Sequence, residues 1–255
     1  MNTHPILNKL SAAVVGVCLM APLAGMAADQ KSDKASMNAP GQDNMAYSDR
    51  ALSKAWGNDK AALQAMLTPG QDKAAYTKLL TDAGYTITSV NADKADYVEY
   101  EVVKGNHSYE VQIDVAGGKA TKVDVATNMW RTDTTKATMR GSKMTAVAKY
   151  TPANDMYSDR ARMKTWTGEK DMLEKSLAPG QPKGYYADAL KKAGYQVTSI
   201  NANKKDYVEY EIVKADNSYE VQIDFDNAGK ASKVDVATNM WQTEATERAM
   251  AAFKK

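Results

Sequence analysis

Apolar and polar residues alternate in three runs of this chain, and the same three runs occur twice. Alternation with a period of two is typical of β-strands that bury one face. Short segments containing Gly, Asn or Asp separate the runs, so each copy is predicted to form an antiparallel meander. The runs lie at 97–104, 109–114 and 123–130 in the first copy, and at 207–214, 219–224 and 234–241 in the second.

Helical spacing of apolar residues precedes the strands in each copy. Ser48 or Asp49 can cap the first helix, and Gly84 ends the last one. Helices followed by strands predict an α+β fold of two repeated domains, each with N-terminal helices packed on one face of a roughly four-stranded antiparallel sheet. In the first copy the expected helices are 48–56, 59–67 and 72–83, and the expected strands are 86–91, 97–104, 108–115 and 119–126.

The two copies extend beyond the strands and divide the chain into domains. Tyr47-Ser-Asp-Arg50 recurs as Tyr157-Ser-Asp-Arg160, and the segment after each sheet is also related, with a helix expected in 244–253. Recurrence at one long period indicates a tandem duplication and not a solenoid. The expected parts are a signal peptide (1–27), a flexible leader (28–46), repeat 1 (47–139), a linker (140–156) and repeat 2 (157–255).

The N-terminus has the features of a secretory signal. Lys9 precedes the apolar run 10–23, and Gly25-Met-Ala27 offers small residues for cleavage before Ala28. The run is shorter than the roughly 20 residues of a spanning helix, so a membrane anchor is not expected. Cys18 lies in the apolar run and lacks the preceding small residue of a lipoprotein signal. The periplasm of a Gram-negative bacterium is the simplest destination.

Removal of that segment leaves a mature chain with no cysteine and a formal charge of +1, because Lys9 is the one charged side chain lost. The mature protein therefore forms no disulfide. Its nearly neutral balance of interleaved charges indicates no nucleic-acid partner, and no later apolar run predicts a membrane span.

Each predicted sheet has one apolar and one acidic face. In repeat 1 the apolar face includes Val98, Tyr100 and Val102 and should form the core. The opposite face, here called the acidic face, is expected to meet solvent with ordinary pKa values. It carries Glu99, Glu101, Glu110, Gln112, Asp114 and Asp124, and in repeat 2 Glu209, Glu211, Glu220, Gln222, Asp224 and Asp235.

Aromatic residues among these carboxylates suggest a protein-binding surface. Trp130 and Trp241 lie just beyond the last strands, where they could instead hold the C-terminal extensions onto the core. The candidate binding face comprises Tyr97, Glu99, Glu101, Trp130, Tyr207, Glu209, Glu211 and Trp241.

The order Ala-Gly-Tyr, Tyr-Val-Glu-Tyr-Glu-Val, Tyr-Glu-Val-Gln-Ile-Asp and Lys-Val-Asp-Val-Ala-Thr-Asn resembles the PepSY domain family, over about 72–130 and 181–241. Asn128 and Asn239 stand where the family usually has Gly, and Asn also tolerates a left-handed turn. The resemblance implies secreted or membrane-tethered modules with a helix on an antiparallel sheet, which bind proteins or inhibit proteases. It supplies no shared site residues.

Familiar catalytic chemistry has few candidates here. His107 lies in a hairpin and corresponds to Asn217, so it is interpreted as a turn residue. Paired Glu99 and Glu101 could act as an acid and base, but a solvent-facing pair is not typical of a glycosidase. Metal binding would need the thioethers of Met129, Met139, Met240 and Met250 without His or Cys.

The sequence thus predicts a non-enzymatic periplasmic protein without a cofactor or bound metal. Its expected partner is a protein or peptide of the cell envelope, with protease inhibition or regulation of an envelope enzyme as the implied role. The alternative is an envelope stress or sensor protein that binds a small ligand or metal ion on the acidic face.

Overall fold

The computed structural model describes residues 44–144 and 148–253, so the expected signal peptide and nearly all of the expected leader lie outside the described residues. Repeat 1 contains η1 (Met45–Tyr47), α2 (Asp49–Met66), α3 (Lys73–Asp82), β1 (Thr86–Asp93), β2 (Tyr97–Lys104), β3 (His107–Ala116), β4 (Lys119–Thr127) and α4 (Asp133–Met139). Repeat 2 contains η2 (Pro152–Tyr157), α5 (Asp159–Ser176), α6 (Lys183–Lys192), β5 (Gln196–Asn203), β6 (Tyr207–Lys214), β7 (Asn217–Phe225), β8 (Ala231–Thr238) and α7 (Glu244–Ala252). The predicted α+β class is confirmed.

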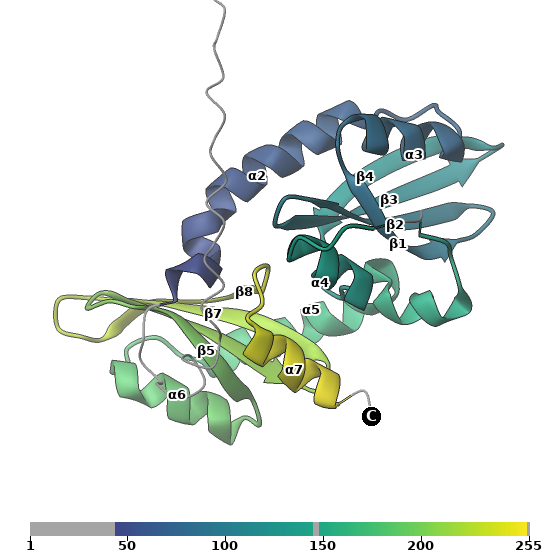
Figure 1. The fold of residues 1–255 in the computed structure, drawn as a ribbon. Coiled ribbons are helices and arrows are strands. Elements are labelled where there is room, and N and C mark those ends of the chain that lie inside the picture. The colour runs from purple at the N-terminus through teal and green to yellow at the C-terminus, as the bar shows by residue number, and fades with distance from the viewer. Residues whose placement is uncertain (1–43, 145–147, 254–255) are drawn as a thin grey trace, which may run out of the picture. The chain divides into compact units, whose positions relative to one another are not determined.

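Each repeat has one antiparallel sheet with its strands in chain order, β1-β2-β3-β4 and β5-β6-β7-β8. The registers match, since Tyr100 pairs with Val111 in repeat 1 and Tyr210 pairs with Val221 in repeat 2. Figure 1 shows α3 and α6 each lying along its own sheet. The predicted apolar face forms the core in both repeats, where these four side chains are at most 5% exposed.

The long first helix differs from the prediction of two shorter ones. Ser48 caps α2 by accepting a hydrogen bond from the Ala51 amide, and the helix continues through Gly57 for 18 residues. A glycine inside a helix costs roughly 1 kcal/mol relative to alanine. Leu63 and Leu67, both 1% exposed, lie in the repeat 1 core, and their burial outweighs that cost. In repeat 2, α5 runs through Gly168 in the same way.

The expected leader and linker are also partly structured at their C-terminal ends. Met45 and Ala46 belong to η1, and 152–156 belong to η2. Both short helices lead directly into a long helix. Among the described residues, no helix combines the length and apolar character needed to cross a membrane.

The hairpin between β6 and β7 contains the one described non-glycine residue with a positive φ, Ala215 at 53°. Its counterpart in repeat 1 is Gly105, at 62°. A side chain in this left-handed region costs about 1–2 kcal/mol, and this cost is partly offset because glycine loses more conformational freedom on folding.

We therefore expect Ala215→Gly to raise the free energy of unfolding by up to about 1 kcal/mol, and Gly105→Ala to lower it by a similar amount, in urea titrations. Equal stability of both variants and the parent would contradict this reading of the turn.

Candidate functional site

The glutamates of the acidic face are buried where the sequence predicted an open surface. All eight residues of the candidate binding face are between 0% and 8% exposed, and Glu99, Glu101, Glu209 and Glu211 are fully buried. The expectation of a solvent-facing surface is therefore wrong for these glutamates, whereas Asp114, Asp124 and Asp224 remain partly exposed. Helices cover this face, and the two glutamates of each central strand bind helix N-termini.

Glu101 and Glu211 each hold the C-terminal helix of their own repeat. Glu101 accepts hydrogen bonds from the Thr132 amide at 3.1 Å and from the Thr132 and Thr135 hydroxyls, at the start of α4. Glu211 accepts the equivalent bonds at the start of α7, including 3.1 Å from the Thr243 amide. A carboxylate is favoured there by the unpaired amides and the positive end of the helix dipole.

Glu99 and Glu209 instead hold the long helix of the other repeat. Glu99 accepts hydrogen bonds from the Ser158 hydroxyl at 3.0 Å and the Asp159 amide at 2.7 Å, at the start of α5. Glu209 accepts the matching bonds from Ser48 at 2.9 Å and the Asp49 amide at 2.7 Å, at the start of α2. Because successive residues of a strand alternate in direction, residues two apart share a face, and each central strand can bind two helices side by side.

The first helical residues complete this reciprocal contact in repeat 2. The Asp49 carboxylate accepts hydrogen bonds from the Met240 amide at 3.2 Å and the Trp241 amide at 3.4 Å. Arg50 stacks over the Tyr207 ring, 3.6 Å from its centroid, and pairs with Asp224 at 2.7 Å.

The contacts of Arg50 have equivalents in repeat 1. Arg160 lies 3.6 Å from the centroid of the Tyr97 ring and pairs with Asp114 at 2.7 Å. The Tyr-Ser-Asp-Arg motif thus joins the repeats, a role that sequence reasoning missed. Its exact recurrence at two helix starts, outside the PepSY-like segments, was the available signal.

The tryptophans contact the hairpins of the opposite repeat. Trp130 donates a hydrogen bond from Nε1 to Asn217 Oδ1 at 3.1 Å, and the Trp241 ring meets His107 edge-on at 5.9 Å between centroids. Both tryptophans are buried. They therefore lock the repeats together. His107 also lies 3.1 Å from Asp59. It is the first residue of β3 and pairs with Lys104, so its interpretation as a turn residue is wrong.

Burial also changes the pKa values of the carboxyls at the interface between the repeats. Burial raises the pKa of Glu110 well above its usual range, and the neighbouring Glu99 raises it further. Burial likewise raises the pKa values of Asp49, Glu101, Asp159, Glu211 and Glu220. Arg131 is the buried cation among them, 4% exposed, and donates to Ser108 Oγ at 2.9 Å and to the Met240 carbonyl. Burial thus disfavours the charged form of these carboxyls.

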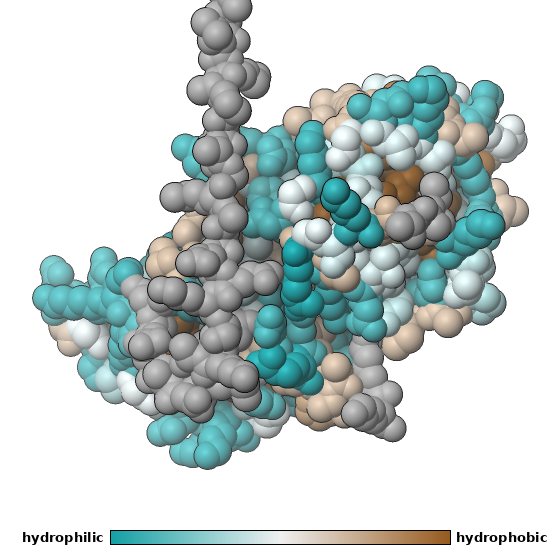
Figure 2. Space-filling view, viewed as in Figure 1, coloured by the Kyte–Doolittle hydropathy of each residue, from teal (hydrophilic) through white to brown (hydrophobic). Residues whose placement is uncertain are grey.

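An open site exists elsewhere in repeat 1, beside the edge strand. This site, the β1 groove, has a volume of about 400 Å³. Figure 2 shows a small apolar hollow within a largely polar surface. The groove is lined by Thr77, Ile87, Val90, Asp93, Tyr100, Ala148, Lys149 and Tyr150.

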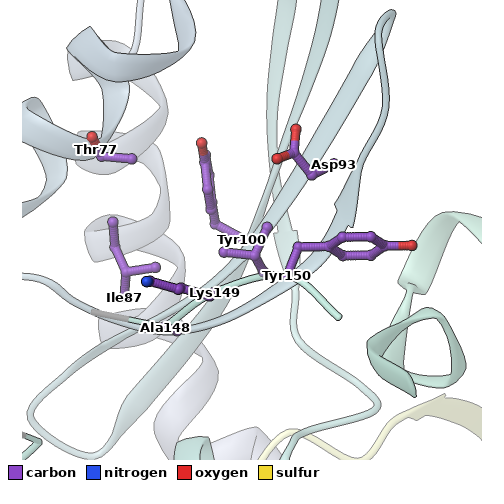
Figure 3. A pocket seen from close by; sticks show the side chains of 8 residues that line it. Thr77, Ile87, Asp93, Tyr100, Ala148, Lys149 and Tyr150 are labelled. Carbon is purple, nitrogen blue, oxygen red and sulfur yellow. The ribbon is translucent and has the colours of Figure 1, made fainter. Parts of the chain in front are cut away.

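The β1 groove combines apolar walls with polar groups at its margin. Burial raises the pKa of Tyr100 to about 12, so its phenol stays protonated and can donate a hydrogen bond. Figure 3 shows Tyr100 between Thr77 of α3 and Asp93 of β1. Ala148 and Tyr150 pack against the repeat 1 core, so a short stretch of the chain's own linker already forms one wall.

The described residues include no group of three or more His, Cys, Asp or Glu side chains arranged to hold a metal ion. The buried carboxyls of Glu99, Glu101, Glu209 and Glu211 instead accept hydrogen bonds at helix N-termini. Comparison with protein-family models, curated proteins and solved structures finds no match for this chain. The functional argument therefore rests on the site itself.

Proposed function

We propose that this chain is a non-enzymatic periplasmic protein that binds a segment of a protein or peptide partner in the β1 groove. The observation that carries the proposal is the position of the linker. Its residues Ala148 and Tyr150 pack on the repeat 1 core beside about 400 Å³ of open groove. An extended chain therefore already fits one side of the site.

The chemistry of the groove supports a peptide over a small polar ligand or metal ion. Ile87 and Val90 offer apolar contact, and Tyr100 offers a hydroxyl. Asp93 and Lys149 provide opposite charges at the margin. Apolar walls with a few placed polar groups are typical of binding sites in this volume range. On the acidic face, which the sequence suggested as a ligand surface, the central glutamates are buried against helix N-termini.

The PepSY resemblance and the expected signal peptide add the cellular setting to the proposal. They imply an envelope protein, and inhibition or regulation of an envelope protease is the specific role that the resemblance implies. Two repeats joined through reciprocal helix contacts would present the groove on a rigid scaffold, which lowers the entropic cost of binding.

Site-specific photo-crosslinking tests this function. We expect benzoylphenylalanine at position 77 to capture one envelope protein in periplasm, and the same residue at Lys122, exposed on β4, to capture none. The purified partner should bind the parent chain and lose at least tenfold in affinity, about 1.4 kcal/mol, with Thr77→Arg or Lys149→Glu. If the partner is a protease, its activity should fall on binding.

Equal capture at both positions, or unchanged affinity in both variants, would contradict the assignment to the β1 groove. Lys149 is exposed, and Thr77 is half-buried at the groove and outside the repeat 1 core, so neither change removes a core side chain. A lost affinity therefore reports the site and not unfolding.

A further inference from the structure

Each repeat carries both sides of the contact that joins the repeats. One side is the Tyr-Ser-Asp-Arg motif. The other side, here called the acceptor face, is Tyr97, Glu99 and Asp114 in repeat 1 and Tyr207, Glu209 and Asp224 in repeat 2. The motif of each repeat binds the acceptor face of the other repeat. A surface that contains both sides of its own contact is typical of a two-fold symmetric dimer.

The two contacts between motif and acceptor face have nearly the same geometry. The serine hydroxyl donates to the glutamate at 2.9 Å in one contact and at 3.0 Å in the other, and the aspartate amide donates at 2.7 Å in both. The arginine lies 3.6 Å from the centroid of the tyrosine ring and 2.7 Å from the aspartate in both. Either motif therefore fits either acceptor face in residue type and in geometry.

Repeat 2 also has the other groups that repeat 1 supplies to it. Trp130 donates from Nε1 to Asn217, and the Tyr47 carbonyl accepts a hydrogen bond from Asn201. The equivalents of these two donors and acceptors in repeat 2 are Trp241 and the Tyr157 carbonyl. A second copy of repeat 2 can thus replace repeat 1 in these contacts without a change of residue type.

Two contacts between the repeats are not duplicated. Arg140 pairs with Glu247, and Arg131 donates to a main-chain carbonyl of repeat 2. Repeat 1 has Lys136 where repeat 2 has Glu247, so a second copy of repeat 1 would bring a like charge toward Arg140. Repeat 2 has the uncharged Ala251 in the place of Arg140, so a second copy of repeat 2 brings no such charge. Both contacts favour the mixed pair of repeats within one chain, and pairing with itself is favoured for repeat 2 over repeat 1.

We propose that repeat 2 pairs with repeat 2 of a second copy of this chain, with the motif at 157–160 of each copy bound to the acceptor face of the other. This pairing reproduces the hydrogen bonds, ring stacking and ion pair of the mixed pair. Within one chain the linker holds the repeats at an effective concentration on the order of mM. The mixed pair is therefore the form at low concentration, and the pair of copies forms when repeat 1 is displaced.

Charge reversal in repeat 1 tests this pairing in the full chain. Arg50→Glu/Asp114→Arg places like charges in both ion pairs of the mixed pair and leaves repeat 2 unchanged, and like charges across an interface suppress a pairing. The four side chains of these ion pairs are 33–43% exposed, so the changes bury no charge. At about 100 µM, well below the effective concentration within the chain, light scattering should give at least twice the mass of the parent.

Arg50→Glu/Asp224→Arg is the matched control, because it also reverses two charges but keeps them opposite within one chain. We expect the control and the parent to remain single copies. A protease site inserted between Ser142 and Lys143, both exposed, identifies the paired repeats after the folded chain is cleaved. Native mass spectrometry should find two copies of repeat 2 together in the test variant, and one copy of each repeat together in the control.

A test variant that stays a single copy, or that releases only single repeats on cleavage, would overturn the proposal. The parent supplies a second measurement that does not depend on folding of the variant. After cleavage of the folded parent, pairs of repeat 2 should appear beside the mixed pair and should increase as the concentration is raised about tenfold. Mixed pairs and single repeats alone, or pairs of repeat 1 as abundant as pairs of repeat 2, would overturn the proposal.

Discussion

Acidification from pH 8 to pH 5 is expected to stabilise this protein. Burial raises the pKa values of Glu110 and Glu220 well above the usual range, and neither carboxyl has a hydrogen-bond partner in the described part of the chain, so the folded chain holds protons there that the unfolded chain releases. Each proton held in excess changes the free energy of unfolding by about 1.4 kcal/mol per pH unit. With one such proton across the range, Tm should be about 8 °C or more higher at pH 5.

This expected gain of stability on acidification is opposite to ordinary acid denaturation. Between the usual carboxyl pKa and the raised one, the unfolded state binds fewer protons than the native state, so stability falls as pH rises. Arg50 lowers the pKa of Asp224 through their ion pair. That contribution is lost only as the pH falls through the lowered pKa, below the range measured.

Glu110→Gln and Glu220→Gln isolate the source of this effect. Glutamine has nearly the shape of a protonated glutamate but does not ionise. We expect each variant to match the parent at pH 5, to exceed it at pH 8, and to show a shallower dependence of unfolding free energy on pH. A parent that loses stability steadily from pH 8 to 5 would show that the buried carboxyls do not hold protons.

Removal of Glu99 should cost about 3–5 kcal/mol of unfolding free energy, because Glu99→Ala leaves the buried Ser158 hydroxyl and Asp159 amide without their acceptor. Glu209→Ala should cost a similar amount, since it removes the matching bonds to Ser48 and Asp49. Urea titrations at pH 7 measure both losses.

Asp124→Ala provides the control, because Asp124 lies on the same sheet face but its side chain is 44% exposed and pairs with Lys122. We expect a change below about 1 kcal/mol there. Should Glu99→Ala fail to fold, Glu99→Gln, which keeps an oxygen acceptor, gives a smaller loss of the same kind. A loss below about 1 kcal/mol in the alanine variants would contradict the helix-binding role.

Local patterns in the sequence predicted the strands, the core face and the class of fold. Tyr97–Lys104 forms β2 as expected, because alternation with buried Val98, Tyr100 and Val102 specifies both the strand and its inward face. The long helix was missed because Gly57 and Asn58 interrupt the helical pattern, whereas packing of Leu63 and Leu67 on the sheet decides the outcome.

The burial of the glutamates on the acidic face could not be predicted from the sequence of one repeat. Glu99 and Glu101 show the alternation of a solvent-facing strand, yet each meets a helix N-terminus whose amides replace water. One of those helices belongs to the other repeat, and its contact depends on how the two copies meet. The β1 groove could not be predicted from the sequence either, since Ala148 and Tyr150 lie in a linker without a periodic pattern.

Carboxyl footprinting tests the central claim, that the repeats bury the glutamates of their acidic faces and leave binding to the β1 groove. The native chain is treated with a water-soluble carbodiimide and an amine, and labelled residues are located by mass spectrometry. We predict that Glu99, Glu101, Glu209 and Glu211 stay unlabelled until the chain is unfolded, while Asp133, 96% exposed, is labelled at once. Labelling of Glu99 and Glu209 at the rate of Asp133 would show an open acidic face and contradict the claim.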